Sequence, residues 1–197
     1  KHLKKMIPAY DLPQAKSLRS VLKAGARSTY TPVTAQPVDL AVLQYTGGTT
    51  GVAKGAMLTH ANLVSNMLQL QASLGEDMKD GEEVCIAPLP LYHVYAFTLH
   101  LLLISSKGGH SVLIPNPRDL PALLNALKKH RFSMFVGLNT LFVSLCQNSQ
   151  FKRLDFSALK ITASGGMALT RDAAERWEQV TGCRVCEGYG LTECSPV

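Results

Sequence analysis

The chain has 197 residues, of which 46% are hydrophobic and 17% charged, so it is long enough to bury one sizeable core. It contains no run of about 18 apolar residues, which argues against a transmembrane helix. The net charge of +6 arises in residues 1–29, which contain seven Lys and Arg but only one acidic residue, while the rest of the chain is neutral.

This basic segment could meet an anionic membrane or a nucleic acid. Tyr10 is its one aromatic residue, and it holds no recognisable DNA- or RNA-binding motif, so a nucleic-acid partner is not expected. A solvated face of a larger domain is the preferred interpretation, with peripheral membrane contact left open. Residues 1–38 are therefore expected to form a basic surface or connecting segment.

From residue 39 onward, short apolar runs alternate with helical patterns. The expected strands are residues 41–45, 84–87, 111–114, 133–136, 159–163 and 184–187. The expected helices are residues 59–74, 92–106, 117–130, 139–147 and 170–181. Thr59 is typical of a helix N-cap, and Gly75 and Gly182 of helix ends. The alternation predicts an α/β fold with a mainly parallel sheet flanked by helices on both faces.

The five cysteines are odd in number and scattered, which argues against a disulfide framework and for a reducing compartment. Cys183 and Cys186 form a C-x-x-C pair. Because residues three apart on a strand point to opposite faces, we expect packing rather than metal or redox chemistry.

Residues 45–56 read Tyr-Thr-Gly-Gly-Thr-Thr-Gly-Val-Ala-Lys-Gly-Ala. Glycine N–H groups can approach an anion closely, threonine hydroxyls add donors and lysine adds a positive charge, so the loop suits nucleotide phosphates. It is not a Walker A loop, because Lys54 is followed by Gly55 rather than Ser or Thr. The alternative is a simple Gly/Thr-rich turn between a strand and a helix.

Two further motifs also follow expected strands. They are Ser-Gly-Gly-Met-Ala-Leu at residues 164–169 and Gly-Tyr-Gly-Leu-Thr-Glu at residues 188–193. Ligands of parallel sheets sit at the carboxyl ends of the strands. We therefore expect all three motifs at one edge of the sheet.

In this order, and with Pro-Leu-Tyr-His at residues 90–93, the motifs resemble those of the adenylate-forming enzymes: acyl-CoA synthetases, luciferases and the adenylation domains of peptide synthetases. The extended form Gly-Tyr-Gly-Leu-Thr-Glu-Cys-Ser-Pro is most similar to bacterial long-chain fatty-acid–CoA ligases. The resemblance implies that residues 39–197 are the nucleotide-binding α/β portion of an AMP-binding domain, within a large N-terminal domain. It also implies ATP-dependent activation of a long-chain fatty acid through an acyl-adenylate to acyl-CoA, with Mg²⁺, release of pyrophosphate and then release of AMP.

The resemblance assigns roles to the matching positions. The catalytic residues would be Lys54, Thr192, Glu193 and His93. The nucleotide would be bound by Thr46, Gly47, Gly48, Thr49, Thr50, Gly51, Lys54, Gly165, Gly166, Met167, Gly188, Tyr189, Gly190 and Thr192. The acyl substrate would contact His93, Gly137 and Gly190, and Mg²⁺ would be coordinated by Glu193 and Thr46. From the residues alone, His93 could instead be a core histidine, and Gly137 a strand-end turn.

The family's ribose-binding aspartate, hinge and C-terminal lysine would lie beyond Val197, so we expect a fragment that is inactive alone. One alternative is an adenylation domain that delivers an amino or aryl acid to a carrier protein. Another is a non-catalytic nucleotide-binding or membrane-association module. The expected location is cytoplasmic, with contact at the inner membrane face and homodimer formation left open.

Overall fold

The computed structural model describes residues 11–46 and 53–197 of the chain. The chain forms two compact units, of which the first ends at Ala35 and the second begins at Gln36. The first unit contains helix α1, Leu18–Gly25, whose N-cap Ser17 accepts a hydrogen bond from the backbone N–H of Ser20. The sequence did not predict this helix, because eight residues are too few for a clear periodic pattern.

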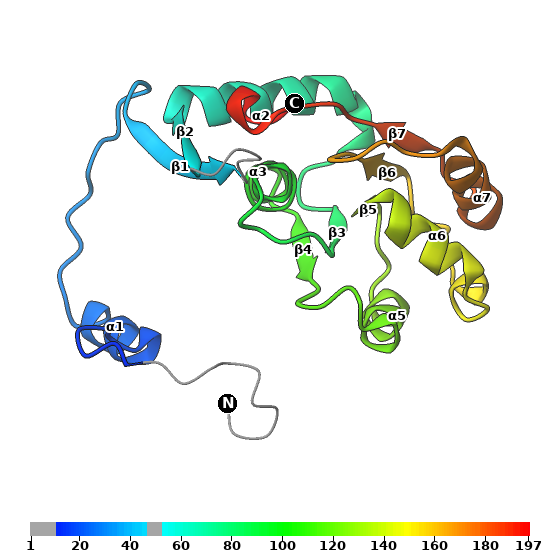
Figure 1. The fold of residues 1–197 in the computed structure, drawn as a ribbon, viewed down its shortest axis with the longest axis horizontal. Coiled ribbons are helices and arrows are strands. Elements are labelled where there is room, and N and C mark those ends of the chain that lie inside the picture. Colours follow the sequence, from blue (N-terminus) through cyan, green and yellow to red (C-terminus); the bar gives the residue numbers. More distant parts are fainter. Residues whose placement is uncertain (1–10, 47–52) are drawn as a thin grey trace. The chain divides into compact units, whose positions relative to one another are not determined.

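The second unit is built on a five-stranded parallel sheet (Figure 1). Its strands are β3 (Val84–Ala87), β4 (His110–Leu113), β5 (Met134–Gly137), β6 (Ile161–Ser164) and β7 (Val185–Glu187), in the order β4-β3-β5-β6-β7. Every neighbouring pair is parallel. The predicted α/β fold is confirmed, and each expected strand lies within two residues of its observed position.

Helices cover both faces of this sheet. They are α2 (His60–Leu74), α5 (Leu120–Lys129), α6 (Asn139–Gln147) and α7 (Arg171–Thr181), with a helical stretch from Val94 to Ser106. Successive strand residues point to opposite faces. Phe135 therefore joins the core under α5, α6 and α7 around Trp177, whereas Met134 joins the core under α2 and the helical stretch. The rings of Phe135 and Trp177 lie 5.0 Å apart between centroids.

The helical stretch is not the uniform α-helix over residues 92–106 that the sequence predicted. It consists of α3 (Val94–Ala96), a π-helical segment (Phe97–Leu103) and α4 (Ile104–Ser106). Within the π-helical segment, His100 is buried with its Nδ1 3.4 Å from Cys85 Sγ. Burial lowers the pKa of His100 to about 4, so the ring is neutral at pH 7. π-Helical segments occur frequently at functional sites.

A second, two-stranded sheet pairs β1 (Leu40–Thr46) with β2 (Lys54–Thr59) in antiparallel fashion. The sequence predicted β1 but not β2. Because β1 does not belong to the parallel sheet, the prediction that the first motif follows a strand of that sheet was wrong. The loop itself, at residues 47–52, lies outside the described residues. The predicted N-cap at Thr59 is confirmed: its Oγ1 accepts from the N–H of Asn62 at 3.2 Å, and Asn62 Oδ1 accepts from the N–H of Thr59 at 3.0 Å.

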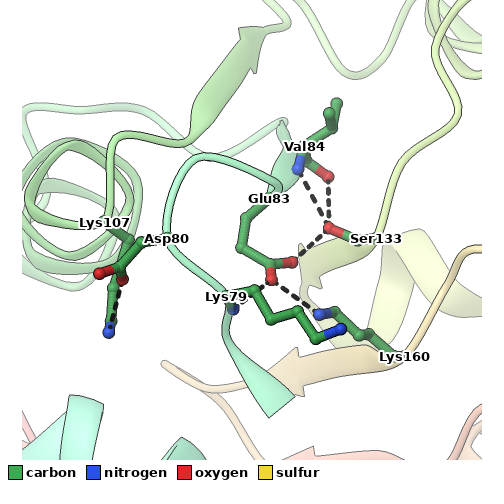
Figure 2. A network of polar contacts seen from close by, with 7 residues as sticks. All are labelled: Lys79, Asp80, Glu83, Val84, Lys107, Ser133 and Lys160. Atoms are coloured by element: carbon green, nitrogen blue, oxygen red, sulfur yellow. Dashed lines mark hydrogen bonds and ion pairs between the residues drawn. The ribbon is translucent and has the colours of Figure 1, made fainter. Parts of the chain in front are cut away.

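A buried carboxylate fastens the amino ends of three adjacent strands (Figure 2). Glu83 directly precedes β3, and its carboxylate accepts hydrogen bonds from Ser133 Oγ at 2.6 Å and Lys160 Nζ at 2.7 Å. Ser133 and Lys160 directly precede β5 and β6. A third bond, at 2.7 Å, comes from the backbone N–H of Lys79. Burial alone would raise the pKa of Glu83, but these three donors outweigh it and hold the pKa below its ordinary value.

Candidate functional site

Three adjacent strands end at the same level on the carboxyl edge of the parallel sheet. Gly137 of β5 pairs with Ser164 of β6, and Ser164 pairs with Glu187 of β7. Just beyond β7, the N–H of Gly188 donates to the carbonyl of Ser164 at 2.8 Å. The segments that follow β6 and β7 therefore leave the sheet side by side, as the sequence predicted for these two motifs.

These two segments enclose a hollow of about 550 Å³. It is lined by Gly166, Met167 and Ala168 on one side and by residues 187–190 on the other. Gly166 has a φ of +77°, a left-handed conformation that favours glycine. The side chain of Tyr189 is 84% exposed, which leaves its ring free for stacking. The volume falls in the range of small-molecule sites.

Side-chain hydrogen bonds hold the walls of this hollow. Glu187 Oε1 accepts from the N–H of Leu169 at 3.0 Å, which joins the end of β7 to the segment after β6. Asn139 Oδ1 accepts from the N–H of Thr170 at 2.9 Å and from its hydroxyl at 3.0 Å. The sequence analysis missed both Glu187 and Asn139. Only the position of Glu187, directly before the Gly-Tyr-Gly motif, could have drawn attention to it.

Behind the hollow, Gly165 lies against the ring of Tyr95. A Cβ atom at Gly165 would stand 2.9 Å from Tyr95 Cζ, so a side chain there would collide with the ring. Burial raises the pKa of Tyr95, so its hydroxyl stays protonated. Tyr95 Oη and Ser164 Oγ are buried, and among the residues that the structure describes neither has a hydrogen-bond partner. Unsatisfied buried hydroxyls of this kind are uncommon in folded proteins, and both lie next to the hollow.

The predicted catalytic residues lie on different elements. Thr192 and Glu193 lie on the 3₁₀ turn η4 (Thr192–Cys194), and β2 packs against this turn. Lys54 begins β2 and is exposed, and its carbonyl accepts a hydrogen bond from Thr46 Oγ1 at 3.4 Å. Glu193 is also exposed. The predicted phosphate ligands Gly47, Gly48, Thr49, Thr50 and Gly51 lie outside the described residues.

The structure places His93 and Gly137 in different surroundings. His93 is exposed at the N-cap of α3, where its Nδ1 accepts from the N–H of Tyr95 at 3.2 Å, so it is not a core histidine. Gly137 is buried at the end of β5. A Cβ atom there would lie 3.0 Å from the ring of Phe135 and 3.1 Å from that of Phe142, so aromatic side chains already fill the adjacent space.

No cluster of three or more His, Cys, Asp or Glu side chains suited to a metal ion occurs within residues 11–46 and 53–197. Glu193 nevertheless fits Mg²⁺, which proteins often hold through one or two carboxylates together with substrate phosphates. Cys183 is buried and Cys186 exposed, which is consistent with opposite faces, and both thiols are free. Among the helices that the structure describes, none has the length and apolar character needed to cross a bilayer.

Comparison with known proteins identifies the family. The AMP-binding enzyme family matches residues 2–197. A long-chain-fatty-acid–CoA ligase of Escherichia coli O157:H7 is 49% identical over 197 residues, which is 100% of this chain and 35% of the relative. The chain thus spans about a third of the length of such curated relatives.

Solved structures agree with this assignment. ATP-bound MatB from Rhodopseudomonas palustris is 28% identical with a TM-score of 0.74, covering 90% of this chain and 34% of that one. The N-terminal domain of FACL13 from Mycobacterium tuberculosis shares the fold, with 23% identity, a TM-score of 0.79, and coverage of 92% of this chain and 44% of that one. The family match over almost the whole chain and the hollow between its two glycine motifs lead to one conclusion: the chain belongs to the AMP-binding enzyme family.

Proposed function

We propose that the protein containing this chain activates a long-chain fatty acid with ATP and transfers the acyl group to coenzyme A. The observation that carries the proposal is the hollow between residues 166–168 and 187–190, beside the turn that bears Thr192 and Glu193. The 49% identity to a long-chain-fatty-acid–CoA ligase supports this substrate class over delivery to a carrier protein and over a non-catalytic role.

In this proposal the hollow takes the adenine end of ATP. Tyr189 offers a flat exposed face for stacking, and the backbone at Gly165 and Gly166 can lie close to the ring. Met167, Gly188 and Gly190 complete the walls. The pyrophosphate end would reach the residues after β1, with Lys54, Thr46 and the loop at residues 47–51 as donors.

The first step must bring a fatty carboxylate to a polyanionic phosphate. Lys54 offsets that repulsion, and Thr192 donates to the α-phosphate, so that the carboxylate oxygen attacks in line with the departing pyrophosphate. Glu193 and Thr46 would hold Mg²⁺, which neutralises phosphate charge when bound. His93, exposed at the start of α3, would border the reacting carboxylate. In the second step the thiol of coenzyme A attacks the acyl carbon and AMP leaves.

The acyl chain would run along apolar side chains of residues 92–106 and 135–145. We keep Gly137 as a candidate for this wall, but Gly137→Leu is a poor test of it. A leucine there would first collide with Phe135 and Phe142, and would therefore report core packing.

Pyrophosphate exchange by the full-length parent protein, with acids from C4 to C18, tests the function. Each buried CH₂ is worth about 0.8 kcal/mol, so kcat/KM should rise roughly fourfold per added CH₂ until the site is full. Glu193→Ala should lower exchange by about 10²-fold. A flat length profile, or an amino acid that outperforms every fatty acid, would favour the carrier-protein alternative instead.

The same proposal includes a cytoplasmic location with peripheral contact at the inner membrane face. The basic residues of the first 29 positions support such contact, since each Lys or Arg near an anionic surface contributes about 1 kcal/mol. Binding of the parent protein to vesicles with anionic lipids should fall sharply as salt rises. Equal binding to neutral vesicles would contradict this part.

A further inference from the structure

Two side chains from separate helices hold the segment Ser195–Val197. Asn66, in the middle of α2, is 3% exposed; its Nδ2 donates to the carbonyl of Val197, and its Oδ1 accepts from the N–H of Val197 at 3.4 Å. Thr98, in the π-helical segment, is fully buried, and its Oγ1 donates to the carbonyl of Ser195 at 3.3 Å. In Figure 1 this red segment runs beside α2.

The held segment directly follows the turn that carries Thr192 and Glu193. Gly190, which precedes this turn, lies so close to the carbonyl of Pro196 that a Cβ atom there would overlap it. Gly190 and Pro196 therefore lie in contact on either side of this turn. Ser195 and Pro196 are buried, whereas Glu193 is exposed. The turn therefore presents Glu193 to solvent while the residues after it are packed against the helices.

Asn66 is suited to this task by its chemistry. Val197, the last residue of the chain, is 42% exposed, and its backbone offers one donor and one acceptor. A carboxamide can bond to both from one side chain. Asparagine is a poor helix former and is rarely buried. Its place inside α2 is accounted for by these two bonds and by a third, in which Nδ2 donates to Gln69 Oε1 at 3.2 Å.

We propose that Asn66 and Thr98 are positioning residues that hold Thr192 and Glu193 in the orientation required for ATP and Mg²⁺. This inference rests on the proposed function for the role of Thr192 and Glu193. Its structural part, the anchoring of residues 190–197, does not depend on that function. Two measurements therefore test the two parts separately.

Hydrogen exchange in the full chain tests the anchoring. Asn66→Ala should raise amide exchange in residues 190–197 by about tenfold or more, because the N–H of Val197 loses its acceptor. Gln71→Ala is the matched control. Gln71 Nε2 also links α2 to the neighbouring helical stretch, through Ser106 Oγ at 2.7 Å, but makes no bond to residues 195–197. Equal exchange in both variants would overturn the anchoring.

Kinetics of the full-length parent test the positioning. Asn66→Ala and the near-isosteric Thr98→Val should each raise the Mg²⁺ concentration for half-maximal pyrophosphate exchange by about tenfold and lower kcat, whereas Gln71→Ala should not. A lower melting temperature with an unchanged Mg²⁺ dependence would show that both residues stabilise the fold but do not position Thr192 and Glu193. If Asn66→Ala does not fold, Thr98→Val decides the question.

The outcomes separate the two proposals. A wild-type parent with no pyrophosphate exchange would remove the proposed function, while the hydrogen-exchange result would still stand on its own. An active parent whose Asn66→Ala and Thr98→Val variants keep the wild-type Mg²⁺ dependence would overturn the positioning role alone.

Discussion

Gly165 occupies a position where the backbone must pass the ring of Tyr95. The ring belongs to the segment after β3, and the glycine to the segment after β6, so this contact joins two parts of the sheet edge. A Cβ atom at Gly188, on the neighbouring segment, would meet nothing closer than the carbonyl of Ser164 at 3.8 Å. A side chain would therefore be tolerated far less at Gly165 than at Gly188.

This difference gives a prediction for stability. Gly165→Ala should lower the free energy of unfolding by about 1–3 kcal/mol, because the new methyl group forces the Tyr95 ring to move. Gly188→Ala should change it by less than about 0.5 kcal/mol. Denaturant unfolding of both variants checks the pair, and a partial recovery in Gly165→Ala with Tyr95→Leu would identify the ring as the cause. Equal losses in the two single variants would refute the explanation.

Some site residues could be predicted from the sequence and others could not. Gly166, Tyr189 and Glu193 stand in local motifs whose spacing is visible in the chain. Glu187 and Asn139 shape the same hollow through hydrogen bonds to residues 18 and 31 positions away. Such pairings depend on which strands become neighbours, and no local pattern records that.

At the level of secondary structure, some helices and strands could be predicted from the sequence and others could not. α2 matches its expected ends because Thr59 caps its start and Gly75 ends it. α6 also matches, although its N-cap residue Leu138 makes no side-chain cap hydrogen bond. β2 escaped notice, since Lys54–Thr59 lacks a clear apolar alternation and becomes a strand by pairing with β1. The π-helical segment was equally hidden, because an apolar run of this length is typical of any buried helix.

The carboxylate of Glu83 is the main polar link between strand ends, and its protonation gives a second prediction. The pKa of Glu83 lies below the ordinary value of 4.5 in the folded chain. Its ionised form therefore stabilises the fold above about pH 4.5, and this contribution is lost as the pH falls through the folded pKa. Glu83→Gln should lower the free energy of unfolding by about 1–3 kcal/mol at pH 7, and by less at pH 3.

Asp80→Asn is the control for this experiment. Asp80 pairs with Lys107 at 2.9 Å, but its side chain is 81% exposed, whereas that of Glu83 is fully buried (Figure 2). An exposed pair contributes little, so its loss should cost less than about 0.5 kcal/mol at either pH. A Glu83→Gln variant whose deficit stays constant from pH 7 to pH 3 would contradict the assigned pKa shift.

At the scale of the whole molecule, the chain covers 35% of the length of an E. coli relative, yet it holds both glycine motifs and Glu193. We propose, from the resemblance to adenylate-forming enzymes, that a ribose-binding aspartate and a mobile lysine lie outside these 197 residues. The chain would then provide one side of the reaction site.

The corresponding prediction concerns the isolated chain. Residues 1–197 should form acyl-CoA at least about 10³-fold more slowly than the full-length parent, since several transition-state contacts are missing together. A coupled assay for AMP release, with the parent as positive control, measures this. Turnover at the parent's rate would show that these residues suffice.

The strand order also determines when the hollow can form during synthesis. In the parallel sheet of the described chain, β7 is the last strand in sequence and pairs only with β6. A chain that emerges from the ribosome can assemble β3, β4, β5 and β6 before β7 exists. The wall formed by residues 187–190 follows β7, so a nascent chain that ends before β7 lacks one side of the hollow.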